Sequence, residues 1–169
     1  MFRKRLTYSV FVGGLLFLPV AIFLKNETII NWTTSEPRGL YLEVKHSQMA
    51  EICLTKEQGQ QAANSGENFL SGRCPGGHSP TLKGLFYATK EEPIVFSGYG
   101  FEIGGRLLIN TAPLLSSSTG MPLTSIEFKK YDQGIFAIST HNSHSYDSRY
   151  FGTIESSQIY GYAFPIFAF

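Results

Sequence analysis

The chain has 169 residues, enough for one domain with a real core, and its formal net charge is +1 at pH 7. The charges are nearly balanced, and the sequence has neither a basic patch that would suggest nucleic-acid binding nor an acidic run that would suggest disorder. With 14 Phe, 9 Tyr and apolar segments punctuated by glycine, the composition predicts a mainly β domain.

The amino end combines a basic cluster over residues 1–7 with an uncharged stretch over residues 8–24. As a helix, that stretch would span roughly 26 Å, close to the ~30 Å hydrocarbon core of a bilayer. Because basic residues stay in the cytoplasm, we expect a cytoplasmic tail over 1–7, one transmembrane helix over 8–24 and an extracytoplasmic domain over 25–169. A cleavable signal is an alternative, although residues 23–27 lack small residues at cleavage spacing. A buried core helix is a third interpretation.

A short segment rich in hydroxyl groups follows and reads Asn31-Trp-Thr-Thr-Ser-Glu-Pro-Arg-Gly-Leu-Tyr41. Pro37 fixes its own φ, and Gly39 permits a turn that other residues resist. Ser35 is therefore a candidate nucleophile on a rigid, bent segment. Thr33 adds a second hydroxyl on the same side if the segment is extended. An ordinary surface turn is the plainer interpretation.

Next we expect a strand over 40–44 and a polar insert over 46–77. Within the insert, the Thr55-x-x-Gln58 pattern of a capping box predicts a helix over 56–63. Cys53 and Cys74 are the only cysteines, and an even pair in an oxidising compartment predicts a disulfide. A zinc site that adds His46 or His78 is a weak alternative, since the cysteines form no tight pair, and we expect no metal.

A lone lysine interrupts the apolar residues 80–88. If these residues form a strand, Lys83 shares a face with Thr81, Leu85 and Tyr87. A lysine in such company either extends its amine to water or lies buried with a lowered pKa. An ordinary lysine on an edge strand is the alternative.

Further strands are predicted over 94–97, 99–103 and 106–110. Residues 125–131 and 134–140 are expected to form a hairpin across Asp132-Gln-Gly134. The apolar tail, residues 159–169, is too short to span a bilayer. We expect it to be a core strand, with a surface that sits on lipid as the alternative.

The loop over residues 142–152 carries charges and hydroxyl groups. Asp147 and Arg149 are close enough to pair, and Gly152 would end the loop. His141 and His144 suggest a Ser-His-Asp triad with Asp147. A serine–lysine dyad, in which a desolvated lysine takes the serine proton, is the competing arrangement.

The order of these features resembles the type I signal peptidases: an anchor, Ser35-x-Pro37, Lys83 on an apolar strand, and Asp-Ser-Arg-Tyr-Phe-Gly over 147–152. The form Asn31-x-Thr-x-Ser-x-Pro-x-Gly-Leu-Tyr41, with Cys-Pro-Gly-Gly over 74–77, is most similar to the TraF-type branch, the plasmid conjugative-transfer peptidases that mature pilin. The resemblance covers nearly the whole chain. The chain departs from the family at Gly84, where Arg or Pro usually follows the lysine. Lys90 therefore stays as a second candidate base.

The resemblance implies a role for each candidate residue. Ser35 would be the nucleophile and Lys83 its base, with Ser145 orienting the lysine. Thr33 and the Ser35 N–H would form the oxyanion hole, with Asp147 and Arg149 supporting the loop. A lysine that works as a base near neutrality needs its pKa lowered by about 2–3 units. No cofactor is implied.

We therefore expect a signal-peptidase-like β domain with one N-terminal transmembrane helix in a bacterial inner membrane, its catalytic part in the periplasm. The expected activity is serine endopeptidase cleavage of a secreted precursor after small residues. A conjugative pilin is the expected substrate, with cyclisation as a variant outcome. Expected partners are the precursor, the lipid bilayer and other conjugation subunits. The alternatives are a general type I signal peptidase and a non-catalytic subunit of a secretion machine.

Overall fold

The computed structural model describes residues 28–169, and every structural statement below refers to these residues. The expected basic tail and transmembrane helix, residues 1–24, lie outside this part of the chain. Between residues 28 and 169, none of the helices has the length and apolar character needed to cross a bilayer.

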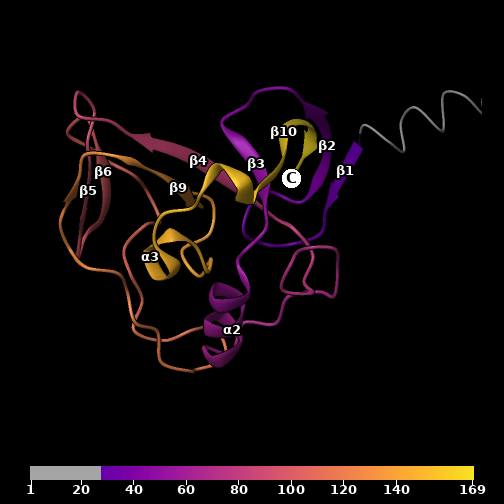
Figure 1. The fold of residues 1–169 in the computed structure, drawn as a ribbon, viewed down its shortest axis with the longest axis horizontal. Helices are drawn as coiled ribbons and strands as arrows, with labels where there is room; N and C mark the ends of the chain where they lie inside the picture. The colour runs from indigo at the N-terminus through magenta and orange to yellow at the C-terminus, as the bar shows by residue number, and fades with distance from the viewer. Residues whose placement is uncertain (1–27) are drawn as a thin grey trace, which may run out of the picture.

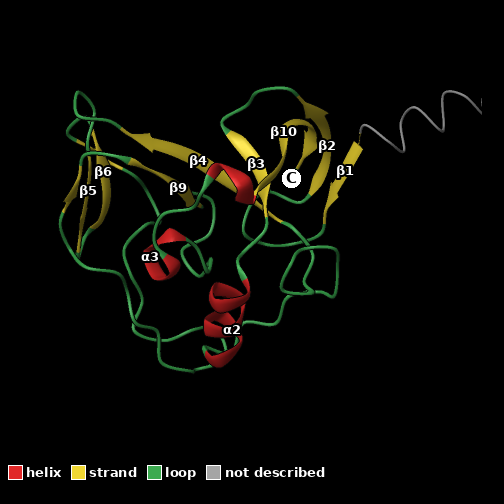
Figure 2. Ribbon diagram, viewed as in Figure 1, coloured by secondary structure: helices red, strands yellow, loops and turns green. Residues whose placement is uncertain are grey.

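Most strands belong to one six-stranded antiparallel sheet, so the prediction of a mainly β domain is confirmed (Figures 1 and 2). In spatial order the strands are β1 (Thr28–Asn31), β2 (Gly39–Val44), β10 (Ile159–Ala168), β3 (Met49–Ile52), β4 (Thr81–Ala88) and β9 (Gly134–Ile138). β2 and β3 follow each other in the sequence, yet β10 lies between them and pairs with both. The β1–β2 hairpin is therefore linked to the rest of the sheet through β10.

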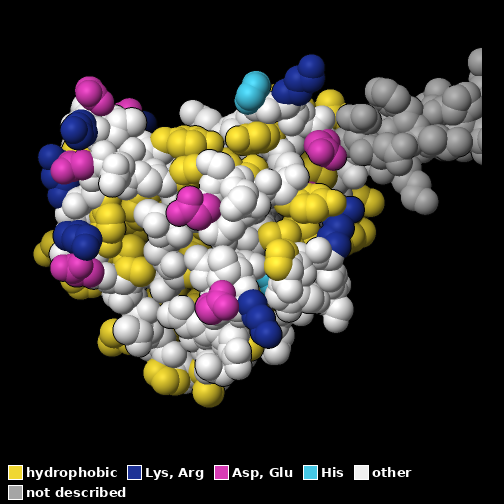
Figure 3. Space-filling model, in the orientation of Figure 1, with side chains coloured by type: hydrophobic (Ala, Val, Ile, Leu, Met, Phe, Trp, Pro, Cys, Tyr) yellow, Lys and Arg dark blue, Asp and Glu magenta, His cyan; other side chains and the backbone are white. Residues whose placement is uncertain are grey.

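A smaller four-stranded sheet packs at one end of the domain. Its order is β7 (Arg106–Leu107), β6 (Gly100–Ile103), β5 (Ile94–Ser97) and β8 (Lys130–Tyr131). Phe96 stacks on Phe101 at a centroid distance of 4.3 Å, and Phe101 meets Phe136 of β9 edge-on at 5.5 Å. These rings join the two sheets in one core. Lys, Arg, Asp and Glu side chains gather over this end, on the left of Figure 3.

The predicted helix is confirmed as α2 (Lys56–Asn64), and its N-terminus carries the expected capping box between Thr55 and Gln58. Two other short helices are α3 (Ser148–Phe151) and the 3-10 turn η1 (Ser156–Gln158). The expected polar insert over 46–77 needs correction, because β3 lies inside it and buries Ala50 and Ile52 completely. Four residues, of which two are buried, are too short a pattern to be recognised as an interior strand.

The predicted hairpin between 125–131 and 134–140 is wrong. β8 pairs with β5, while β9 pairs with β4 over five register positions from Gly84 to Ala88. Residues 136–138 are completely buried in the pairing with β4. β8 has only two residues and is too short to pair with all of β9. The strand predicted over 106–110 is also shorter than expected and ends at Leu107.

The tail forms a strand, as predicted, but only one side of it belongs to the core. Ala163 of β10 is fully buried, whereas Phe164 and Phe167 are 58% and 66% exposed. Gly39 of β2 is needed beside this strand. Its φ is +152°, and a Cβ there would lie 2.0 Å from the Phe167 carbonyl oxygen.

The predicted disulfide between Cys53 and Cys74 is confirmed, with a Cα–Cα distance of 5.3 Å. It ties the residue after β3 to the loop that precedes β4. Because both thiols are used in this bond, the alternative zinc site with these cysteines is wrong.

We predict that the double substitution Cys53→Ser with Cys74→Ser lowers the free energy of unfolding. The bridge closes a loop with a sequence separation of 21, for which the chain-entropy model gives about 3 kcal/mol. Urea unfolding followed by circular dichroism measures the loss, with Ser157→Ala as a surface control. An unchanged midpoint would show that the bridge adds no stability.

Candidate active site

The segment between β1 and β2 is held by the side chain of Asn31, which is 4% exposed. Its Nδ2 donates to the carbonyl oxygens of Glu36 at 3.0 Å and Pro37 at 2.9 Å. Its Oδ1 accepts from the Thr33 N–H at 3.1 Å and the Thr33 hydroxyl at 2.7 Å. One buried amide therefore binds both sides of Ser35, and the loop is fixed without regular secondary structure.

Three polar groups meet next to this loop. Lys83 lies on β4, and its Nζ is 2.8 Å from Ser35 Oγ and 2.5 Å from Ser145 Oγ. The Ser145 hydroxyl donates to Ser35 Oγ at 3.3 Å, which closes a triangle. Lys83 and Ser145 are buried and Ser35 is half-buried, so of these three residues only Ser35 is open to solvent.

Burial changes the protonation of Lys83. The side chain is 2% exposed, and the cost of desolvating an ammonium lowers the pKa of Lys83 from 10.5 to about 8. The nearby carboxylates of Asp147 and Glu36 oppose this effect and raise the pKa. An appreciable fraction of Lys83 is therefore neutral slightly above neutral pH, which is unusual for a lysine.

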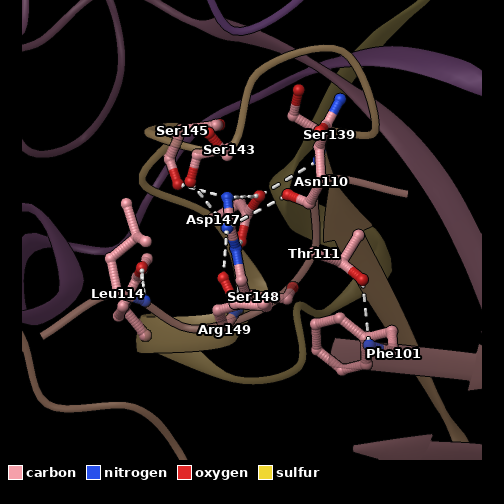
Figure 4. Close-up of polar contacts among 12 residues, drawn as sticks. Phe101, Asn110, Thr111, Leu114, Ser139, Ser143, Ser145, Asp147, Ser148 and Arg149 are labelled. Atoms are coloured by element: carbon pink, nitrogen blue, oxygen red, sulfur yellow. Dashed lines mark hydrogen bonds and ion pairs between the residues drawn. The ribbon is translucent and has the colours of Figure 1, made fainter. Parts of the chain in front are cut away.

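A buried ion pair supports the Ser145 loop. Asp147 and Arg149 are both fully buried, and the Arg149 Nε–H donates to Asp147 Oδ1 at 2.8 Å. The remaining guanidinium donors bind the carbonyl oxygens of Asn110, Ala112, Ser143 and Ser145 and the second carboxylate oxygen of Asp147 (Figure 4). Asp147 also caps α3 through the Arg149 N–H. The pair expected from the sequence thus forms in the interior.

Ser139, for which the sequence predicts no role, connects this ion pair to Ser35. The Ser139 N–H donates to Asp147 Oδ2 at 3.1 Å, while its hydroxyl donates to the Ser35 carbonyl oxygen. Asn142 adds a bond from its Nδ2 to the Thr34 carbonyl oxygen at 3.1 Å. A serine directly after a buried apolar strand was the available signal, but its partner lies 104 residues away.

Thr33 and the Ser35 N–H, the donors expected to form an oxyanion hole, lie on the same loop. Within residues 28–169 the Ser35 N–H donates to no other residue. The Thr33 hydroxyl proton is directed at Asn31, because the Asn31 oxygen accepts it while the Asn31 amide nitrogen serves two carbonyl groups. Thr33 must rotate away from Asn31 before it donates to another acceptor.

Glu36 is a second residue without a predicted role. It is 6% exposed, and its Oε1 accepts from the Gly84 N–H at 3.3 Å. Burial raises the pKa of Glu36 from 4.5 to about 7, although Lys83 and the Gly84 hydrogen bond counteract the increase. Next to Ser35 there is therefore a carboxyl group that changes charge near neutral pH.

The other candidate bases lie elsewhere. His141 and His144 are exposed, and in the described chain neither ring bonds to Ser35 or Asp147. The alternative triad with Asp147 is therefore wrong, since Arg149 takes up both Asp147 oxygens. Lys90 is exposed in the turn after β4, whereas Lys83 contacts Ser35.

A groove of about 660 Å³ lies beside the first residues of the loop that carries Ser35. One wall is residues 29–33, from β1 and the serine loop, and another is residues 79–82, at the start of β4. β1 is an edge strand, and β4 pairs with β9 only from Gly84 onward. Both walls of the groove therefore include strand residues with one side unpaired in the described sheet. Residues of the disulfide loop, including Leu70 and Arg73, line it further out.

Comparison with known proteins gives a consistent set of relatives. The chain is 30% identical over 133 residues to plasmid transfer protein TraF of Escherichia coli, covering 76% of this chain and 70% of that protein. A second Escherichia coli protein of that name is 28% identical over 165 residues, which is 92% of each chain. The probable conjugal transfer protein TraF of Sinorhizobium fredii is 30% identical over 145 residues, covering 79% and 73%. No family model matches the chain, and no solved structure does.

We predict that Arg149→Met destabilises the fold strongly, because it leaves the Asp147 carboxylate buried without its partner. The expected loss is about 3–5 kcal/mol of unfolding free energy, measured by urea denaturation. The control is Lys129→Met, which breaks the exposed Lys129–Glu127 pair and should change little. Equal effects of the two substitutions would contradict the supporting role of the buried pair.

Proposed function

We propose that this chain, which belongs to the family of TraF plasmid and conjugal transfer proteins, is a serine endopeptidase of the signal-peptidase type that acts in conjugation. The single observation that carries this proposal is the contact between the buried Lys83 amine and the Ser35 hydroxyl at 2.8 Å. A lysine buried against two serine hydroxyls has little structural use, because burying an ammonium costs stability.

The reaction follows from that contact. Neutral Lys83 accepts the Ser35 proton while Ser35 Oγ attacks the carbonyl carbon of the scissile peptide bond. The ammonium so formed gives its proton to the departing amine, and an ester on Ser35 remains. Water then attacks the ester, and its proton passes to Lys83 and on to the Ser35 oxygen as the acid leaves. The Ser145 hydroxyl holds the lysine amine on line with Ser35 throughout.

The oxyanion of each tetrahedral intermediate needs donors on the side of the Ser35 loop. The Ser35 N–H has no other acceptor among the described residues and is suited to this task. Thr33 supplies a second donor once its hydroxyl turns from Asn31 to the substrate. Asn31 then keeps the Thr33 N–H as its partner, so the loop stays fixed.

The groove supports a peptide substrate in particular. An extended chain placed between β1 and the start of β4 would find main-chain partners on both sides, as in strand addition to a sheet edge. Thr33 and Leu82 line the groove, and they are close in the sequence to Ser35 and Lys83. We infer that the substrate is an exported precursor, and that in conjugation this is a pilin.

A location at the bilayer is part of the proposal and is supported by the surface of the main sheet. Strand register aligns Ile30 with Leu40 and Phe167, and Leu42 with Phe164. These five residues form what we call the outer apolar face, opposite the buried Tyr41 and Ala163. Hydrophobic side chains reach the surface over this region in Figure 3. The apolar run 8–24 ends four residues before β1, at most roughly 14 Å of extended chain.

We predict that Ser35→Ala abolishes processing of the precursor, while expression and membrane insertion continue. Lys83→Met should lose several orders of magnitude in rate, since it keeps the apolar stem but removes the base. The wild-type rate should rise with pH through about 8, because only neutral Lys83 accepts the proton. Gel analysis of precursor cleavage measures all three.

His141→Ala and His144→Ala are the matched controls and should each cost little. A covalent serine probe should label the wild type and not Ser35→Ala. Absence of labelling and of cleavage in the wild type would favour a non-catalytic subunit. The mass of the product separates hydrolysis from ring closure, since a hydrolysed pilin is one water heavier than a ring.

Trp32 is the only tryptophan, is 72% exposed and lies two residues from Ile30 of the outer apolar face. We predict that lipids with brominated acyl chains quench its fluorescence when the full chain is reconstituted in vesicles. Phe164→Asp with Phe167→Asp should reduce the quenching, because charge opposes contact with lipid. Tyr99→Asp, at a still more exposed site on the β5–β6 turn, should leave it unchanged. Trp32 fluorescence that brominated lipid does not quench would contradict contact with the bilayer.

A further inference from the structure

Glu36 is an acidic side chain buried beside the proposed base, and the mechanism above gives it no task. It directly follows Ser35 in the sequence, and its carboxylate is bound by the N–H of Gly84, the residue after Lys83. Its backbone carbonyl is fixed by Asn31. The carboxylate is therefore held between the backbone of the nucleophile loop and the backbone of the strand that carries the lysine.

We propose that Glu36 is a positioning residue that sets the pH at which Lys83 becomes a base and that stabilises the ammonium formed when Lys83 takes the Ser35 proton. This inference rests on the proposed peptidase function.

The other charges near Lys83 leave this role open to Glu36. Asp147 has the largest effect of the surrounding charges, followed by Glu36, Arg149 and Glu67. Asp147 and Arg149 form a closed ion pair, so their opposite effects on Lys83 offset each other in part. Glu67 is half-buried and has the smallest effect of the four. Among residues 28–169, Glu36 is thus the carboxylate with the largest effect on the pKa of Lys83 that forms no ion pair of its own.

The surroundings of Glu36 allow its charge to change. Burial raises its pKa to about 7, Lys83 and the Gly84 N–H lower it, Ser139 lowers it further and Asp147 raises it. Tyr41 also faces Glu36, but its hydroxyl donates to a backbone carbonyl and its pKa is raised, so it stays neutral. Glu36 therefore gains or loses a proton close to the pH range in which Lys83 does.

The two charges act on each other with opposite consequences for the rate. Ionised Glu36 favours the ammonium form and raises the pKa of Lys83, so fewer molecules hold a neutral base at a given pH. The same carboxylate stabilises the ammonium that proton transfer creates, which makes Lys83 a stronger base. Removing the charge should therefore extend activity to lower pH and reduce the maximal rate at high pH.

The test is the pH profile of kcat/KM for precursor cleavage by the full chain carrying Glu36→Gln. We expect the acid limb to move down by about one pH unit and the plateau to fall by up to about tenfold. Glu36→Asp keeps the charge and should return the limb towards the wild-type position. Glu67→Gln is the matched control, and its limb should move much less. A uniform loss of rate with an unmoved limb in Glu36→Gln would overturn the proposal.

A second measurement separates this proposal from the proposed function. In protein labelled with ¹³C-lysine, the Lys83 side-chain resonance, assigned by its absence in Lys83→Met, titrates without any substrate. A lower Lys83 titration midpoint in Glu36→Gln sustains the inference even if the wild type cleaves no precursor, which would refute only the peptidase. If the wild type cleaves the precursor and the Lys83 titration midpoint is the same in Glu36→Gln, the inference is refuted and the proposed function is not.

Discussion

A guanidinium that is closed off from water must find an acceptor for every N–H, because an unmet charged donor in the interior costs several kcal/mol. Arg149 meets this demand with the Asp147 carboxylate and with carbonyl oxygens from residues 110–112 and 143–145. Segments far apart in the sequence are thereby fixed at one point. Ser145 lies in one of them, and Ser139 is bound to the same carboxylate. The hydroxyls around Ser35 and Lys83 take their positions from a charge that contacts neither.

The environment of Lys83 is a compromise between two requirements. A base that works near neutrality needs a lowered pKa, which burial provides. A base that is only desolvated is weak, and it would leave its ammonium form without stabilisation. Carboxylates on three different segments, at positions 36, 67 and 147, counter the burial of Lys83 without cancelling it. A partly offset desolvation gives a lysine that is neutral often enough to accept a proton and basic enough to hold it.

What the sequence predicts here is mostly local. The Thr55 capping box, the strand around Lys83 and the pairing of Asp147 with Arg149 all depend on residues close together in the chain. The partners of β8 and β9 were mispredicted because burial against distant strands outweighed a short turn signal. Ser139 and Glu36 were missed for a similar reason, since each acts on a residue about 50 to 100 positions away. The family resemblance brought Ser35, Lys83 and Ser145 together, but it implied no role for Glu36 or Ser139.

The place of β10 in the sheet has a consequence for biosynthesis. When the ribosome has synthesised the first 150 residues, Ser35 and Lys83 are already part of the chain. β10 has not yet been made, so its place between β2 and β3 is empty. Without that strand, the hairpin with the serine and the strands with the lysine have no shared ladder to hold them in register. Contacts of such large sequence separation also form late and slowly. The sheet that holds Ser35 beside Lys83 is therefore completed only after residues 159–168 have emerged, close to the end of translation.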